Sequence, residues 1–136
     1  MRIYFDENFS NYLTTGFNAF EKGQPSEGIE VFHTTDDFSK GCRDEEWIPG
    51  VAKRHGCVIT KDFNIYRRKY QWELCKKHKV GFFFFRQPKK KKYSYWVWIQ
   101  EIFKRWEEIK EISISRTRPF GIVYEPNKRK YSELDC

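Results

Sequence analysis

Three acidic segments, far apart in the chain, carry the side chains best suited to chemistry. They are Asp6-Glu7, Asp44-Glu45-Glu46 and Asp62, and each lies next to an apolar run. Carboxylates brought together without cations repel one another, and a hard divalent ion such as Mg²⁺ or Mn²⁺ relieves that repulsion. Such an ion lowers the pKa of a bound water and stabilises charge on a phosphoryl group under attack. The residue types therefore indicate a site for a divalent metal ion, provided that the fold gathers the three segments.

Predicted strands end at two of these acids. Residues 2–5 form a short β-rich run that stops at Asp6, and residues 57–60 form a compact strand that is followed closely by Asp62. Between them, residues 29–33 are predicted to form another strand.

Helices are predicted on either side of that middle strand. Ser10 is expected to cap a helix that runs to about Phe20. A second helix should begin at Asp44-Glu45-Glu46, because acids in a first turn suit both capping and the helix dipole. If Asp44 is the cap, Pro49 falls past the first turn, so we expect a kink or a short first segment before the helix ends at Gly56.

The rest of the chain continues this alternation. The pattern predicts a polar loop at 34–43, a basic helix at 67–78, a strand at 80–85, a basic loop at 86–92, a helix from 94 to about 111, a strand at 120–124 and a polar tail. The run at 80–85 is apolar on both sides, which is typical of a central parallel strand covered on both faces. We therefore predict one α/β domain over residues 1–136, with a mostly parallel sheet flanked by helices and a long helix and strand at its C-terminal end.

This topology predicts where the acids meet. In an open α/β sheet, ligands bind beyond the carboxyl ends of the strands, and the returning crossovers place helix N-termini at the same edge. Asp6, Asp62 and the segment that begins at Asp44 should therefore converge. Taken singly, Asp44 is equally well explained as a helix cap and the other two as loop acids. Their joint placement favours a site.

Charge is divided unevenly along the chain. Residues 1–66 carry seven Lys and Arg against eleven Asp and Glu, whereas residues 67–136 carry nineteen against eight. The basic half suits a polyanion, which makes RNA a candidate partner. The cations predicted to contact RNA are Lys61, Arg67, Arg68, Lys89, Lys90, Lys91 and Lys92, with Tyr93, Tyr95 and Trp96 nearby for unpaired bases. The lysine run is alternatively a solvated loop, and the apolar positions 96, 99, 103 and 106 are alternatively core or an interface in a homodimer.

Composition excludes several classes of protein. With 39% hydrophobic and 19% aromatic residues, the 136-residue chain has enough apolar surface for one folded domain. The apolar run at 80–85 is far shorter than the roughly 20 residues of a membrane helix, and the N-terminal run is too short for a signal peptide. The four cysteines lack the spacing of a zinc site and are expected to be reduced. We therefore expect a cytoplasmic protein without membrane contact.

The ordered motifs resemble those of the PIN-like domain family. The segments Phe5-Asp6-Glu7-Asn8, Asp44-Glu45-Glu46-Trp47-Ile48 and Val58-Ile59-Thr60-Lys61-Asp62, followed by Glu73 and the strand at 80–85, are most similar to the VapC-type toxin subgroup. The resemblance covers residues 2–86 as a core and leaves 93–124 as a C-terminal extension. It implies an acidic pocket for Mg²⁺ or Mn²⁺, endoribonuclease activity and a cognate antitoxin. By position it implies catalytic roles for Asp6, Asp44, Glu45 and Asp62, with Asp6, Asp44 and Asp62 as metal ligands.

Departures from the family pattern leave other interpretations open. The chain lacks a clear acid in a helix after the second strand, and Asn64 stands where many relatives have an acid. A phospho-receiver also has acids after its first and third strands, but it requires Ser or Thr at the end of strand four, where this chain has Phe84-Phe85-Arg86. A third interpretation is a nucleic-acid-binding or protein-binding module that is catalytically weak or inactive.

Overall fold

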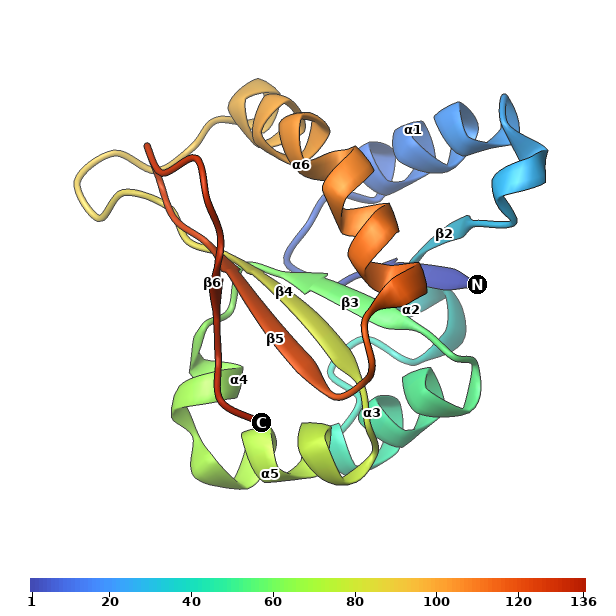
Figure 1. Ribbon diagram of the computed structural model, residues 1–136, viewed down its shortest axis with the longest axis vertical. Helices are drawn as coiled ribbons and strands as arrows, with labels where there is room; N and C mark the ends of the chain where they lie inside the picture. The colour runs from blue at the N-terminus through green and yellow to red at the C-terminus, as the bar shows by residue number, and fades with distance from the viewer.

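Six strands form a single sheet in the computed structural model, which describes residues 1–136. Their bounds are β1 (Arg2–Phe5), β2 (Glu30–His33), β3 (Cys57–Thr60), β4 (Gly81–Phe85), β5 (Phe120–Tyr124) and β6 (Ser132–Glu133). The order across the sheet is β2-β1-β3-β4-β5-β6, with β1 to β5 parallel and β6 antiparallel to β5 (Figure 1). The predicted α/β class, the mostly parallel sheet and its five principal strands are confirmed.

Helices cover both faces of this sheet. Their bounds are α1 (Asn11–Lys22), the short 3₁₀ helix η1 (Pro25–Glu27), α2 (Thr34–Asp37), α3 (Asp44–Lys53), α4 (Asn64–Arg67), α5 (Lys69–Lys77) and α6 (Tyr95–Ser115). α1 and α6 lie over one face, and α3, α4 and α5 lie over the other (Figure 1). No helix combines the length and the apolar character that crossing a bilayer requires.

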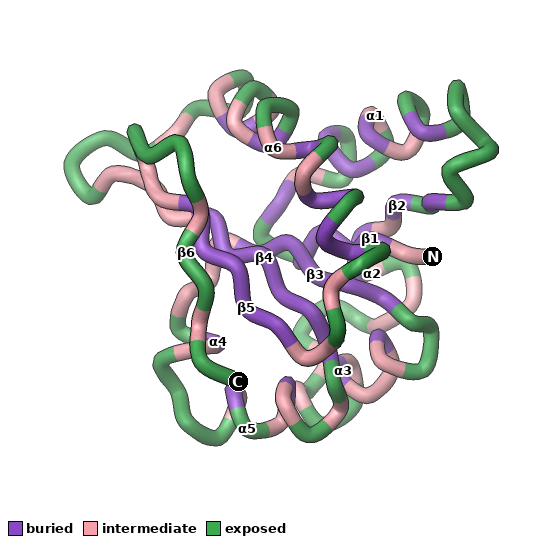
Figure 2. Tube along the Cα trace, in the orientation of Figure 1, coloured by how far each residue is buried: buried purple, intermediate pink, exposed green.

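The strand β4 shows how the sequence builds two cores. Successive side chains of a strand point to opposite faces. Phe83 and Phe85 therefore pack with α1 and α6, whereas Phe82 and Phe84 pack with α3 and α5. All five residues of β4 are buried, as Figure 2 shows for the centre of the sheet. A run of four phenylalanines thus serves both layers, which confirms that β4 is a central strand.

Local signals at the helix ends are partly confirmed. The side chain of Ser10 accepts hydrogen bonds from two backbone amides at the start of α1, as predicted. The cap of α3 is Arg43 rather than Asp44, because the Asp44 carboxylate is engaged by side chains instead of backbone amides. The helix also continues past Pro49 to Lys53 without a break.

Three other segments differ from the sequence prediction. Residues 34–37 form α2 instead of a loop, because the His33 ring accepts a hydrogen bond from the Thr35 backbone amide and the Asp36 carboxylate accepts one from the His33 backbone amide. The predicted helix at 67–78 is divided, since the extended backbone of Arg68 (ψ 107°) separates α4 from α5. Within the tail, residues 132–133 form β6, a two-residue strand that periodicity cannot reveal.

The tail is held by a close approach at Gly121. The backbone amide of Leu134 donates to the Gly121 carbonyl at 2.8 Å. A Cβ atom at this position would lie 2.9 Å from the Trp72 ring and 3.0 Å from the Leu134 side chain, so glycine is needed for both to pack there. The polar tail therefore joins the domain instead of leaving it.

Candidate active site

The strand order creates a crevice between β1 and β3. From β1 the chain crosses to β2 on one side through α1, and from β3 it crosses to β4 on the other side through α4 and α5. The loops after β1 and β3 therefore diverge, and such a switch point is where open α/β sheets bind ligands. Asp6 directly follows β1 and Asp62 lies two residues after β3, so both acids flank the crevice.

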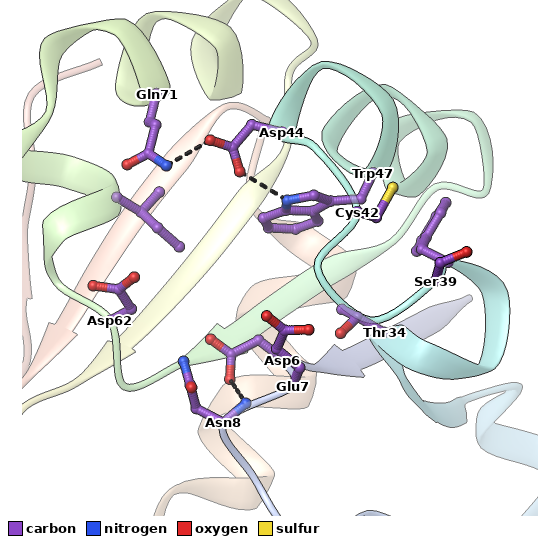
Figure 3. Close-up of a pocket in the computed structure, with 12 residues that line it drawn as sticks. Asp6, Glu7, Asn8, Thr34, Ser39, Cys42, Asp44, Trp47, Asp62 and Gln71 are labelled. Carbon is purple, nitrogen blue, oxygen red and sulfur yellow. Dashed lines mark hydrogen bonds between the residues drawn. The ribbon is translucent and has the colours of Figure 1, made fainter.

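A pocket of about 130 Å³ lies at this point (Figure 3). It is lined by Asp6, Glu7, Asn8, Thr34, Phe38, Ser39, Cys42, Asp44, Trp47, Asp62, Ile65 and Gln71. The strand ends supply the acids on one side, and α3 and α5 supply Asp44, Trp47 and Gln71 on the other. The structure thus brings Asp6, Asp44 and Asp62 to one pocket from three distant segments.

Asp6 is the most buried of these acids, with 7% of its surface exposed. Its Oδ2 accepts a hydrogen bond from the Thr60 hydroxyl, and its Oδ1 accepts one from the Asn8 amide at 3.1 Å. The pKa of Asp6 is raised to about 6, mainly by burial and to a smaller extent by the charge of Asp62, while the two hydrogen bonds and the charge of Lys61 act in the opposite direction. The negative charge of the buried Asp6 carboxylate therefore destabilises the folded protein.

Thr60 links the two strand ends. While its hydroxyl donates to Asp6, it accepts a hydrogen bond from the Asp62 amide at 2.9 Å. Asp62 in turn accepts one from the Asn64 amide through Oδ1 at 3.0 Å. The motif that contains Thr60 predicted no role for this residue. The sequence did contain one indication of such a role: a residue with a hydroxyl group stands at the last position of the strand, and an acid follows shortly after it.

Asp44 faces the same pocket from α3. The Trp47 indole donates to its Oδ1 at 2.9 Å, and the Gln71 amide donates to its Oδ2 at 2.5 Å (Figure 3). These two neutral donors fix the carboxylate without neutralising it. Gln71 lies on α5, 27 residues away, and only the packing of α5 against α3 brings it to Asp44. No sequence signal identified it.

The remaining predicted acids are less central. Glu7 lines the pocket and accepts a hydrogen bond from the Gly41 amide at 3.1 Å. Glu45 does not line it, although it was predicted to be catalytic. Its carboxylate is exposed, and a hydrogen bond from the Tyr70 hydroxyl holds its pKa below the usual value. Glu45 lies about 100° further around α3 than Asp44, and its side chain is directed to Tyr70 instead of the pocket. Glu46 pairs with Arg43 at the cap of α3, and Glu73 pairs with Lys76 of α5.

The acids of the pocket form an open arrangement. No three His, Cys, Asp or Glu side chains are grouped to hold a metal ion between them, so Asp6, Asp44 and Asp62 do not make a closed three-ligand site. Mg²⁺ is nevertheless usually bound through one or two carboxylates and keeps several waters. Asp6 and Asp62, on neighbouring strand ends with oxygen donors only, fit that requirement. The costly charge of buried Asp6 is also what a cation would stabilise.

The predicted cations surround the pocket at different distances. Lys61 is half-buried next to it, where its ammonium donates to the Asn8 carbonyl at 3.2 Å and lies 4.6 Å from the ring centroids of both Phe9 and Trp98. Burial lowers its pKa. Lys89–Lys92 are exposed in the loop after β4, at the same edge of the sheet, and Arg67 and Arg68 are exposed at the end of α4 (Figure 1).

Comparison with known families identifies the fold. The family model described as a PIN-like domain matches residues 1–87, which include β1 to β4 and all three pocket acids. The chain belongs to the PIN-like domain family. PIN-like domains are often metal-dependent nucleases. No curated protein and no solved structure matches the chain significantly.

The PIN-like match ends just after β4. Residues 88–136, with α6, β5 and β6, lie beyond it. β5 nevertheless pairs with β4 along its whole length, and α6 covers the same face as α1. The additional segment is therefore built into the sheet and core of the domain.

Proposed function

We propose that this PIN-like domain is an endoribonuclease that hydrolyses RNA with Mg²⁺ or Mn²⁺. The observation that carries the proposal is the pairing of Asp6 and Asp62 at neighbouring strand ends, joined through Thr60, in a pocket that also receives Asp44. Membership of the PIN-like family supports the same chemistry.

Each side chain has a defined part in this proposal. Asp6 and Asp62 would bind the ion. Thr60 orients the Asp6 carboxylate and accepts a hydrogen bond from the Asp62 backbone amide, and the Asn64 amide orients the Asp62 carboxylate. When bound, the ion supplies a water of lowered pKa and stabilises charge on the phosphorus. Asp44, fixed by Trp47 and Gln71, faces the pocket as a charged acceptor that can orient a water or take its proton.

The electrostatics around the pocket suit an RNA substrate. An acidic pocket alone repels phosphates, but Lys61 lies beside it and Lys89–Lys92 follow the neighbouring strand β4. These cations can bind the phosphate backbone of RNA while the carboxylates of the pocket bind the metal ion. Arg67 and Arg68 extend the positive surface on the α4 side.

The Lys89–Lys92 loop gives a direct test of the RNA-binding surface. Replacing its four lysines by Ser is expected to weaken RNA binding to a similar degree for all sequences. It should also flatten the plot of log affinity against log salt by about 0.7 for each phosphate that the variant no longer neutralises. Fluorescence anisotropy in EDTA measures both effects. The loop should keep its shape, because the Gln87 side chain accepts a hydrogen bond from the Tyr93 amide at 3.0 Å across its base.

A charge-matched control uses lysines at the other edge of the sheet. Lys22, Lys53, Lys77 and Lys79 are exposed near the C-terminal ends of α1, α3 and α5. Replacing these four by Ser changes the net charge equally. If both quadruple variants show the same salt dependence, the Lys89–Lys92 loop has no specific role in binding.

The similarity to VapC-type toxins extends the proposal to a cellular role. A nuclease that cuts cellular RNA harms its host, so a cognate antitoxin would have to block the pocket. An Arg or Lys side chain of that partner, inserted beside Asp6, could displace the ion. Trp96 and Phe103 of α6 are 69% and 55% exposed, and a partner helix or a second copy in a homodimer would cover them.

Cleavage assays with purified protein test the proposed nuclease activity. We expect cleavage of RNA pools in Mg²⁺ or Mn²⁺, complete inhibition by EDTA and recovery when the metal is restored. Expression in a heterologous cell should arrest growth only when Asp6 is intact. Absence of metal-dependent cleavage across varied RNA pools would contradict the proposal.

The second candidate is a binding module without catalysis. The observation that favours it is the lack of a closed set of three metal ligands. Under that alternative, the protein would bind RNA with equal affinity in EDTA and in Mg²⁺, and it would release no shorter products.

A further inference from the structure

Two additional hollows continue from the acidic pocket along the same edge of the sheet. The first has a volume of about 280 Å³ and shares Asn8 with the acidic pocket. The second has a volume of about 610 Å³ and shares Tyr93 with the first. We name them the acidic pocket, the aromatic hollow and the basic hollow from their linings, and each adjoins the next at a shared lining residue. All of the basic hollow and part of the aromatic hollow come from residues 88–136, beyond the PIN-like match.

The aromatic hollow has the chemistry of a base-binding surface. Its walls include Tyr93, Tyr95 and Trp98, and Lys61 lies at its junction with the acidic pocket. Tyr95 is 42% exposed, so its ring is accessible to a planar ligand, whereas Trp98 is buried and its ring faces the Lys61 ammonium. Exposed aromatic rings stack with unpaired bases, whatever their sequence, whereas the bases of a duplex are already stacked.

The basic hollow has the chemistry of a phosphate-binding groove. It lies between α6 and the turn after β5, and its lining includes Lys104, Arg105, Lys128 and Arg129 together with one acid, Glu101. Glu101 pairs with Lys104, and Glu125 pairs with Lys128 from beside the hollow, so the cations remain in excess. Arg105 fixes its shape, because the guanidinium donates to the backbone carbonyls of Lys128 and Arg129. The side chains of those two residues remain exposed beside the groove.

We infer that residues 88–136 extend the acidic pocket into a path for single-stranded RNA, which crosses the aromatic hollow and continues along the basic hollow. The inference rests on the proposed function for the identity of the nucleic acid. Charge and ring chemistry select the occupant: cations bind the phosphate backbone, an exposed ring stacks with an unpaired base, and the acids Asp6 and Asp62 lie at one end. The segment beyond the family match would thus add substrate affinity to a compact nuclease core.

Binding measurements in EDTA test this path without cleavage. Fluorescence anisotropy would compare short and long oligouridine strands, a blunt RNA duplex and the matching DNA strand. The Lys128→Ser/Arg129→Ser variant is expected to lower affinity for long strands and to reduce the salt slope by about 1.4, which is 0.7 for each of two phosphates. Short strands, which reach only the first two hollows, should be affected less. The control variant Lys53→Ser/Lys77→Ser has the same charge change at the opposite edge of the sheet and should bind like wild type.

Substitutions at Tyr95 test the aromatic hollow separately. Tyr95→Ala should weaken single-strand binding by about tenfold, since one base can no longer stack, while Tyr95→Phe retains the ring and should bind normally. Duplex binding should change little in either variant. Unfolding curves check that these exposed substitutions leave the fold intact.

The possible results separate this inference from the proposed function. Weaker single-strand binding in both sets of variants supports the path even if wild-type protein proves unable to cleave RNA. If wild-type protein cleaves RNA but the Lys128/Arg129 and Tyr95 variants bind it normally, the path is wrong and the nuclease proposal stands. Tighter binding of duplex than of single strands, or of DNA than of RNA, would also overturn the path as described.

Discussion

The Asp6→Asn variant is expected to lose metal-dependent RNA cleavage by more than about a hundredfold and yet to be more stable than wild-type protein in EDTA. The loss of activity follows from the proposed ligand role, since changes even in groups that only support a metal ligand cost about 10–100-fold. The gain in stability follows from the burial of the charge. A purely structural carboxylate would give the opposite change in stability.

The sign of the stability change is set by the pKa of Asp6. Folding raises that pKa from 3.8 to about 6, so the folded protein binds more protons than the unfolded chain between these values. The free energy of unfolding therefore falls as pH rises through this range, and above it the difference corresponds to about 3 kcal/mol. Asparagine removes this cost, while its amide can still pair with Thr60 and the Asn8 amide.

Urea unfolding at several pH values in EDTA measures this prediction. Asp6→Asn should exceed wild type by about 1–3 kcal/mol at neutral pH and by little near pH 4, where the wild-type carboxyl is protonated. Asp135→Asn, in the exposed tail, has the same charge change and should unfold like wild type at each pH. A large decrease in the stability of Asp6→Asn would show that the hydrogen bonds of the carboxylate outweigh the cost of its charge.

Sequence patterns predicted those structural features that depend on residues close together in the chain. The alternation around β4, the Ser10 cap and the two acids that follow β1 and β3 are all encoded within a few residues. The convergence of Asp6 and Asp62 could then be derived, because parallel strands place their carboxyl ends at one edge. What could not be derived was how each carboxylate is held.

The contacts that the sequence did not predict are mainly those between helices. Gln71 reaches Asp44 across 27 residues, and Glu45 points away because Asp44 occupies the inward position of α3. The pairings of Asp44 and Glu45 depend on the rotation of each helix about its axis, which hydrophobic periodicity fixes only to within a residue or so. One local contact was also missed, because the ring of His33 caps α2 and histidine is not among the common cap residues.

The other large expected effect concerns an ion cluster centred on the buried side chains of Lys110 and Glu21, in the layer formed by α1 and α6. Lys110 of α6 is 6% exposed, and its ammonium lies 3.0 Å from the carboxylate oxygens of both Glu21 and Glu27 and 3.2 Å from that of Glu107. Glu21 is also buried, and the Trp106 indole donates to it at 2.7 Å. This cluster, invisible to periodicity, fastens the additional helix α6 to α1 in the matched part of the domain.

Lys110→Met is expected to lower the free energy of unfolding by about 3–5 kcal/mol, because it leaves the buried carboxylate of Glu21 without its cation. The control Lys104→Met removes an exposed lysine of the same helix whose partner is Glu101, and it should cost less than about 1 kcal/mol. Adding Glu21→Gln to Lys110→Met should recover part of the loss, since an amide in the same place carries no charge. Urea unfolding of the three variants measures these differences. If Lys110→Met is as stable as Lys104→Met, water must reach the cluster, and α6 is held to α1 by its apolar contacts alone.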